Sequence, residues 1–267
     1  MFMIKYDKNF VYYLGFLWSD GFIERTRVGI EILEDDAVTI VDNICKIDFL
    51  KICTMKRHRK DRRPQMTIYF CNTKIYDSYF SKYFINKSIN SPIELIKLIP
   101  DNLKRYFYLG LIDGDGCFYF NEKNKIRQFY VTSSFDQDWL HMINLFNEIN
   151  VTQYEIRKVE NKNGNKSSYI RIKKYDEILK LFNYLYPNNY EFGLKRKYDK
   201  CKLIIDTKIT RSNNKSKICI EKLTNKIDSG LNILEISEIF ECHWRKIYRY
   251  CKNNNIEYKK GFLKGIS

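Results

Sequence analysis

Two stretches decide how this chain is read: YYLGFLWSDG at residues 12–21 and FYLGLIDGDG at residues 107–116. Both are apolar, helix-like runs that end in Asp-Gly, and the two Asp-Gly pairs lie 95 positions apart. Gly15 and Gly110 fall in mid-helix, where glycine costs about 1 kcal/mol relative to alanine. Each run also ends in an aspartate, which the helix dipole disfavours at that end. Because two unfavourable choices recur at matching places, the repeat indicates a functional site.

The geometry of such a pair predicts where its chemistry lies. A mid-helix glycine permits close approach of another backbone, so we expect Gly15 to pack on Gly110. The helices then run side by side, and their ends bring Asp20 and Asp115 together. Two neighbouring carboxylates repel unless a cation lies between them, and hard divalent cations prefer oxygen ligands. A magnesium ion, or another divalent cation such as Mn²⁺, held there can activate water for phosphodiester hydrolysis.

The pattern after each Asp-Gly pair also repeats, which predicts an α+β unit present twice in one chain. Each unit reads as helix, two strands, helix, two strands and helix. The first unit is expected to have strands at 22–26, 28–33, 50–56 and 66–71, with helices at 36–47 and 74–84. The second is expected to have strands at 117–121, 129–134, 154–159 and 169–173, with helices at 138–149 and 175–186.

The rest of the chain suggests three domains, at residues 1–100, 101–206 and 207–267. Residues 92–100 connect the halves, a helix is expected from 197 to 205, and residues 207–217 read as a linker. Three short amphipathic segments follow, at 218–229, 233–240 and 243–253. We expect their core to contain Ile236, Ile239, Phe240, Ile247 and Tyr250. The outward face of the last segment would present His243, Trp244, Arg245, Lys246, Tyr248 and Arg249.

Charge points to a polyanionic partner. The net charge is +15, from 47 Lys and Arg against 32 Asp and Glu. A surplus of 10 lies in residues 195–267 alone. Nucleic acid is the first candidate and an anionic membrane surface the second, with mere solubility as the alternative. No run of about 18 apolar residues predicts a membrane span, and no secretory signal is expected.

Cysteine and histidine usage argues against zinc. The chain has eight cysteines without a CxxC pair, and only three histidines. Closely spaced ligand pairs, which zinc sites need, are therefore not expected. Unpaired thiols are typical of a reducing intracellular compartment, such as the cytoplasm of a prokaryotic or phage-infected cell, or an organelle.

The second stretch closely resembles the signature of LAGLIDADG homing endonucleases, and the first is a looser copy. The resemblance covers roughly residues 8–205. It implies a saddle of antiparallel sheets in a pseudo-twofold arrangement that straddles DNA and cuts across the minor groove. It also implies that Asp20 and Asp115 bind magnesium as catalytic residues.

Two lysines are added by the same resemblance. Lys87, in the segment Ile85–Ser88 before Pro92, and Lys197, in Leu194–Tyr198, match family positions that help activate water or stabilise the transition state. Lys195 is a rival for the second position because the alignment there can slip. A solvated lysine without a catalytic role remains the alternative at each position.

DNA contacts are expected from three places. The hairpin tips are basic, and phosphate contacts position a protein on DNA. Strand residues can read base edges in the major groove, but their facing depends on a register that the sequence leaves open. The segments 233–240 and 243–251 resemble a helix-turn-helix, whose second helix enters the major groove. The candidate residues are Arg25, Arg27, Lys56, Arg57, Arg59, Arg62, Arg63, Gln128, Arg157, Lys158, Arg171, His243, Arg245, Lys246 and Arg249.

The sequence therefore predicts a monomeric, magnesium-dependent, site-specific endonuclease that makes double-strand breaks at a long DNA target. Two alternatives stay open. One is a non-cleaving regulator that joins a LAGLIDADG-like domain to a helix-turn-helix. The other is an intron maturase, for which intron RNA is the partner.

Overall fold

The computed structural model describes residues 4–24, 26–57, 63–124, 126–207 and 219–258. The chain divides into two compact units, Met1–Lys208 and Ile209–Ser267. The two repeats lie within the first unit and share one hydrophobic core, so neither repeat has a core of its own. The predicted linker at 207–217 lies almost wholly outside the described residues.

The first repeat contains a four-stranded antiparallel sheet of order β1-β2-β4-β3. Its helices and strands are α1 (Lys8–Asp20), β1 (Gly21–Glu24), β2 (Arg27–Leu33), α2 (Glu34–Ile44), β3 (Cys53–Arg57), β4 (Gln65–Cys71), α3 (Thr73–Ile75) and α4 (Ser81–Tyr83).

The second repeat has the same topology, with sheet order β5-β6-β8-β7. Its elements are α6 (Lys104–Asp115), β5 (Gly116–Asn121), β6 (Ile126–Ser133), α7 (Leu140–Glu148), β7 (Glu155–Glu160), β8 (Lys166–Ile172), α8 (Tyr175–Leu185) and α9 (Lys195–Asp206). The predicted tandem α+β arrangement is confirmed.

The differences from the predicted elements are local. The helix expected at 74–84 is interrupted by a π-helical turn, Tyr76–Phe80, between α3 and α4. The connector contains a short helix, α5 (Ile93–Lys97), followed by a 3₁₀ turn at Asp101–Leu103. In addition, β3 begins at Cys53 instead of residue 50, and β8 begins at Lys166 instead of residue 169. Boundaries carry the weakest sequence signal, so errors of this size are expected.

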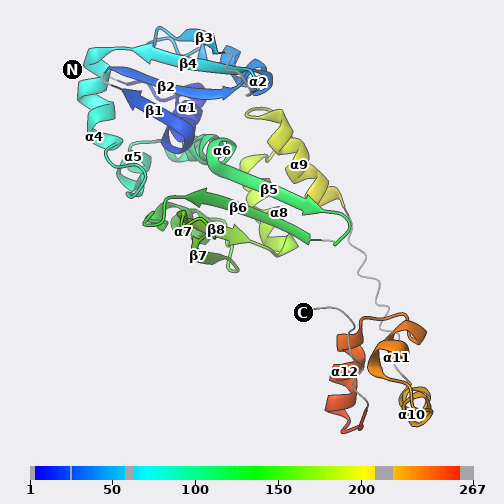
Figure 1. Cartoon of the computed structure of the whole chain (residues 1–267). Coiled ribbons are helices and arrows are strands. Elements are labelled where there is room, and N and C mark those ends of the chain that lie inside the picture. Colours follow the sequence, from blue (N-terminus) through cyan, green and yellow to red (C-terminus); the bar gives the residue numbers. More distant parts are fainter. Residues whose placement is uncertain (1–3, 25, 58–62, 125, 208–218, 259–267) are drawn as a thin grey trace. The chain divides into compact units, whose positions relative to one another are not determined.

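The helices α1 and α6 lie side by side between the two sheets (Figure 1). Their contact depends on glycine, as predicted. A Cβ atom at Gly15 would overlap the carbonyl oxygen of Phe107, and one at Gly110 would overlap that of Tyr12. All residues of α1 from Phe10 to Trp18 are buried, so this helix is apolar on every side. Such a helix is stable only inside a protein, which fixes α1 at the centre of the fold.

Strand register divides each sheet into two faces, because directly paired residues point to the same side. In the first sheet, Val28, Ile30, Ile68 and Phe70 face the core and are almost fully buried. In the second, Phe118, Phe129, Val131, Ile170 and Ile172 do so. The alternate residues define what we call the outer face of each sheet. Charged and amide side chains on the outer faces include Glu24, Arg27, Glu31, Arg57, Gln65, Gln128, Glu155, Arg157 and Arg171.

The second unit contains three helices, α10 (Ile220–Asp228), α11 (Ile233–Ile239) and α12 (Trp244–Asn253). A capping box begins α11, where Asn232 and Glu235 exchange side-chain to backbone hydrogen bonds. The buried side chains of this unit are Leu223, Ile233, Ile236, Ile247 and Cys251. The prediction that Ile239 belongs to this core is wrong, because it is 51% exposed. It is the last residue of α11.

We predict that Gly15→Ala lowers the free energy of unfolding by about 1–3 kcal/mol or more, through overpacking. In an ordinary helix the same change would stabilise by about 1 kcal/mol, so the sign is diagnostic. Chemical denaturation measures the effect, and Asn147→Ala, at an exposed position of α7, is the control. A variant as stable as the wild type would mean that α1 and α6 are not in backbone contact.

Candidate active site

The two predicted acidic residues end the central helices. Asp20 is the last residue of α1 and is exposed, whereas Asp115 is the last residue of α6 and is partly buried. Burial and, secondly, the neighbouring carboxylate of Asp20 raise the pKa of Asp115 to about 6. The charges of Lys87 and Lys197 act in the opposite direction. The four residues predicted to be catalytic therefore share one electrostatic site.

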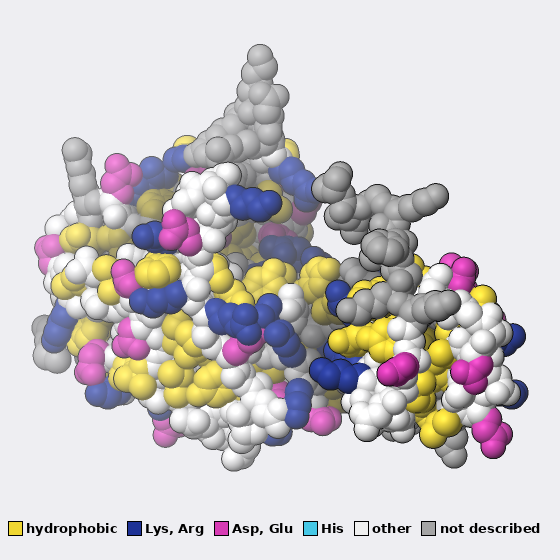
Figure 2. Space-filling view, turned by 60° about the horizontal axis from the view of Figure 1, so that its bottom comes forward, with side chains coloured by type: hydrophobic (Ala, Val, Ile, Leu, Met, Phe, Trp, Pro, Cys, Tyr) yellow, Lys and Arg dark blue, Asp and Glu magenta, His cyan; other side chains and the backbone are white. Residues whose placement is uncertain are grey.

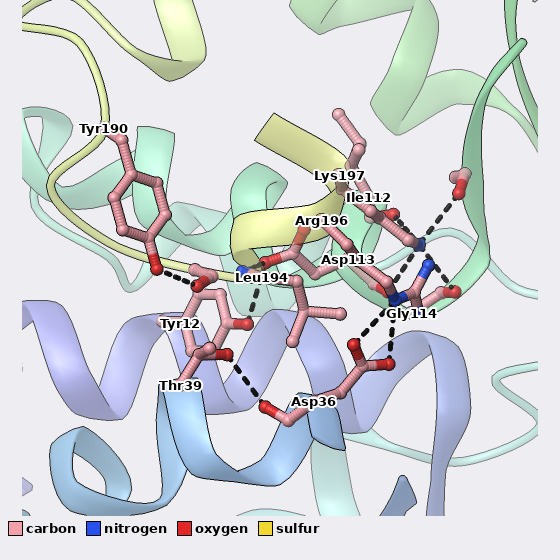
Figure 3. Close-up of polar contacts among 12 residues, drawn as sticks. Tyr12, Asp36, Thr39, Ile112, Asp113, Gly114, Tyr190, Leu194, Arg196 and Lys197 are labelled. Atoms are coloured by element: carbon pink, nitrogen blue, oxygen red, sulfur yellow. Dashed lines mark hydrogen bonds and ion pairs between the residues drawn. The ribbon is translucent and has the colours of Figure 1, made fainter. Parts of the chain in front are cut away.

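The two lysines cap the helices that carry the aspartates. Lys87 Nζ donates to the carbonyl oxygens of Leu17 (2.9 Å) and Ser19 (3.3 Å), and also to that of Gly21. Lys197 caps α6 in the same way. Its Nζ donates to the carbonyl oxygens of Ile112 (2.7 Å), Gly114 (3.1 Å) and Gly116 (2.8 Å), and also to that of Asp113. Figure 3 shows these contacts of Lys197.

This arrangement follows from helix physics. The last carbonyls of a helix lack partners within it, and the helix dipole favours a cation there. Each lysine therefore compensates for the aspartate that the dipole disfavours. Burial lowers the pKa of Lys87 to about 8 and that of Lys197 to about 8, although the nearby carboxylates oppose this shift.

Lys197, and not its rival Lys195, lies at the site. Lys195 is about half exposed and pairs with Asp199 one turn along α9. Lys197 is 5% exposed and directed into α6. The structure therefore places Lys197, and not Lys195, against the end of α6.

Asp113 is a site residue that the sequence analysis did not single out. It is 1% exposed, and its Oδ2 accepts hydrogen bonds from Tyr12 Oη (2.8 Å) and from the backbone N–H of Leu194 (2.7 Å). Burial raises its pKa to about 6. Because Leu194 immediately precedes α9, Asp113 fixes the start of the helix that carries Lys197. The signal was visible, since an aspartate stands here inside an otherwise apolar run.

A second contact ties α9 to the first repeat. Arg196 Nε donates to both carboxylate oxygens of Asp36 in α2, at 2.7 and 2.8 Å (Figure 3). Asp36 is itself largely buried. Together with the hydrogen bond from Tyr12 to Asp113, this ion pair holds the two repeats in register beside the paired aspartates.

A cleft of about 120 Å³ opens beside Asp115. Polar groups of both repeats line it, including Ser19, Lys87, Ser133 and Gln137. His141 lies at its inner end, where burial lowers the pKa of the imidazole to about 3, so this side chain is neutral near pH 7. The cleft is polar enough to hold ordered water next to the carboxylate.

The donor set fits magnesium better than zinc. Among the described residues, no group of three or more His, Cys, Asp or Glu side chains is placed to hold a metal. Magnesium needs no such cage, because it keeps several waters and binds through one or two carboxylates together with substrate phosphates. Asp20 and Asp115 would supply those carboxylates, and burial together with the charge of Asp20 disfavours the charged form of Asp115.

Strand register separates the candidate DNA contacts into two groups. Arg27, Arg57, Gln128, Arg157 and Arg171 lie on the outer faces. The two lysines expected to join them point to the opposite faces, where Lys56 pairs with Glu34 and Lys158 with Asp136. The exposed Arg63 follows the first hairpin tip. Three candidates lie outside the described residues: Arg25, Arg59 and Arg62.

The remaining candidates gather on α12. His243, Arg245, Lys246 and Arg249 line one shallow hollow of about 380 Å³, together with Tyr250 and Asn253. His243 also caps the helix, since its Nδ1 accepts the backbone N–H of Arg245 at 3.2 Å. On the face drawn in Figure 2, Lys and Arg side chains gather in groups with Asp and Glu among them. Positive charge is thus partly paired, not uniformly spread.

Comparison with known proteins supports the fold. The chain is similar to the homing endonuclease I-WcaI bound to its DNA recognition sequence, with 13% identity, a TM-score of 0.51, and coverage of 75% of this chain and 88% of that one. Two further likenesses have lower TM-scores. I-DmoI in complex with DNA and Mn gives 0.44, with 13% identity and coverage of 67% and 96%. Full-length DUF199/WhiA from Thermatoga maritima gives 0.45, with 11% identity and coverage of 94% and 92%.

The likeness to I-WcaI shows the class of fold: the first unit has the LAGLIDADG fold, as its two motifs indicated. No protein-family model and no curated protein matches the sequence. Within the described part of the chain, the helices are all too short or too polar to cross a membrane.

We predict that Asp115→Asn stabilises the metal-free protein by about 3 kcal/mol at pH 7.5, since each pKa unit corresponds to about 1.4 kcal/mol. The folded-state pKa is raised from 3.8 to about 6. The wild type is therefore relatively most stable below pH 4, and it loses this contribution as pH rises through 6. Urea denaturation in a chelator at pH 4 and 7.5 should show a gap only at the higher pH. Equal stability at both pH values would contradict the coupling, and exposed Asp48→Asn is the control.

Proposed function

We propose that this protein is a site-specific DNA endonuclease that makes a double-strand break by magnesium-dependent phosphodiester hydrolysis. One observation carries the proposal. Asp20 and Asp115 end two glycine-packed helices, a lysine caps each of these helix ends, and the charge of Asp20 adds to the effect of burial in raising the pKa of Asp115. At these helix ends the two carboxylates repel each other and would repel phosphate, unless a bound cation compensates their charge.

The roles of the residues follow from their contacts. Bound magnesium would supply an activated water and stabilise the leaving oxygen. Asp20 and Asp115 would hold it. The three N–H donors of Lys197 are shared among four carbonyls, so this lysine contributes charge and a fixed helix end and does not donate a proton. Lys87 has three such acceptors and acts in the same way.

Double-stranded DNA is the proposed substrate, and one chain is the proposed functional unit. The outer faces of the two sheets carry Arg27, Arg57, Gln128, Arg157 and Arg171, types that read base edges in the major groove. Both repeats lie in one chain, so a second copy is not needed to complete the site. We place the enzyme inside the cell, with its eight unpaired thiols in a reducing compartment.

We expect Asp20→Asn and Asp115→Asn each to reduce cutting of both strands about a thousandfold, because the loss of a metal ligand raises the barrier by about 4 kcal/mol. Binding should persist, since each change removes a negative charge that faces phosphate. The assay follows nicked and linear forms of a supercoiled plasmid that carries the target, with magnesium. Asp48→Asn is the matched control.

The same gel decides among the alternatives. Nicking without linearisation would indicate independent metals at the two aspartates. Wild-type rates of cutting in both variants would refute the assignment of the site to Asp20 and Asp115. Absence of cutting by the wild type itself would favour a non-cleaving regulator that binds through the second unit. An intron maturase would instead bind its intron RNA more tightly than the DNA duplex, which competition binding measures.

We further propose that α11 and α12 act as a helix-turn-helix that adds affinity for DNA. Replacing Arg245 and Arg249 with glutamine removes two charges from α12. The slope of log K against log salt should then fall by about 1.8, close to 0.9 for each lost phosphate contact. The control is Lys222→Gln with Lys226→Gln on α10, which makes the same charge change away from the hollow. An equal loss of slope in both doubles would show only general attraction.

A further inference from the structure

Glu155 organises the positive charge on the outer face of the second sheet. It is the first residue of β7 and contacts three cations. Arg157 approaches its Oε2 through Nε (3.1 Å) and Nη2 (2.9 Å), Lys173 Nζ lies 2.9 Å from Oε1, and Arg171 pairs with the same Oε1. Hydrogen bonding to Lys173, with help from Arg171, lowers the pKa of Glu155 to about 2.

Arg171 is the cation held most completely. Its Nε and Nη2 pair with Glu155, its Nη1 points at Gln128 Oε1 (3.5 Å), and its guanidinium lies 4.8 Å from the centre of the Tyr169 ring. Its side chain is 19% exposed, against 57% for Arg157. The guanidinium plane is therefore fixed by a carboxylate, an amide and an aromatic ring, before any ligand arrives.

The first sheet has no such cluster at the matching place. Glu155 pairs in register with Arg171, and the corresponding pair in the first sheet is Cys53 with Tyr69. There, Arg27 lies 4.0 Å from the Tyr69 ring centre. The outer faces of the two repeats are thus organised by different interactions, although their backbones match.

We propose that Glu155 is a positioning residue for base recognition, which holds the guanidinium of Arg171 in place to read a guanine in the half of the DNA target that the second sheet contacts. This inference rests on the proposed DNA-binding function and names the base that one part of that surface selects. Arginine contacts guanine O6 and N7 through two parallel N–H donors, and this contact requires a defined plane. A fixed side chain also loses less conformational entropy on binding than a free one.

A carboxylate on a DNA-facing surface has a second consequence. It repels phosphate and engages cations that would otherwise bind any duplex. Glu155 therefore weakens non-specific binding while it strengthens selection. Removing its charge should change the two properties in opposite directions, which a purely structural role for Glu155 would not do.

The experiment compares the full-length wild type with Glu155→Gln, Arg171→Lys and Glu160→Gln. The last variant is a matched control, because Glu160 lies on the same strand but on the opposite face, 3.8 Å from Lys166. Each protein selects duplexes from a randomised pool in a chelator, so that binding is measured without cutting, and the bound DNA is sequenced. Affinity for an unrelated duplex is measured alongside.

We expect the wild type to select a guanine that Glu155→Gln and Arg171→Lys both stop selecting, at the same position and by about tenfold. Glu155→Gln should also bind the unrelated duplex more tightly than the wild type, and Glu160→Gln should keep the selected guanine.

If Glu155→Gln retains the guanine preference of the wild type, this inference is overturned while the proposed function stands. A loss in Glu155→Gln that Arg171→Lys does not share would overturn it too, since the carboxylate would then read a cytosine amino group directly. A wild type that selects no sequence at all would refute the proposed function, and this inference with it.

Discussion

The backbone contact between α1 and α6 at Gly15 and Gly110 is the constraint on which the rest of the first unit depends. Neither helix tolerates a Cβ atom there, so the helices approach more closely than side chains would permit. This proximity puts both C-terminal ends at one point and the sheets on opposite sides of the pair. The last carbonyls of both helices have no partner within the helix, so they need donors from elsewhere in the chain.

Those partners come from segments distant in sequence, and the elements involved position each other. Lys87 returns to α1 from the turn before the connector, and Lys197 returns to α6 from α9. Asp113 in turn fixes the start of α9, so α6 positions the helix that caps it. Each buried charge thus lies among several polar groups, and removing one leaves others without partners, which costs more than a single hydrogen bond.

Much of this was predictable because local sequence carries it. Hydrophobic periodicity and the repeated Asp-Gly runs gave the order of elements, the glycine contact and the paired aspartates. The features that the sequence analysis did not predict depend on tertiary context. The pairing of Arg196 with Asp36 joins residues 160 positions apart, and no local pattern indicates it. Which face of the sheet Lys56 and Lys158 lie on depends on the strand register, and a shift of one residue would reverse it. The π-helical turn at Tyr76–Phe80 has no distinctive composition.

The two repeats have the same backbone topology but differ in side chains at matching positions. In the first repeat, Trp18 stands at the position that Asp113 has in the second. Trp18 packs on Phe84 and has no carboxylate to hold the start of a helix, as Asp113 does. Lys87 stands in a turn, whereas Lys197 stands on a helix. A homodimer would be forced to use identical halves, and its preferred DNA target would be palindromic. In the proposed endonuclease, joining the repeats in one chain removes that restriction, so each outer face would match a different base sequence while the shared helices keep both aspartates at one centre.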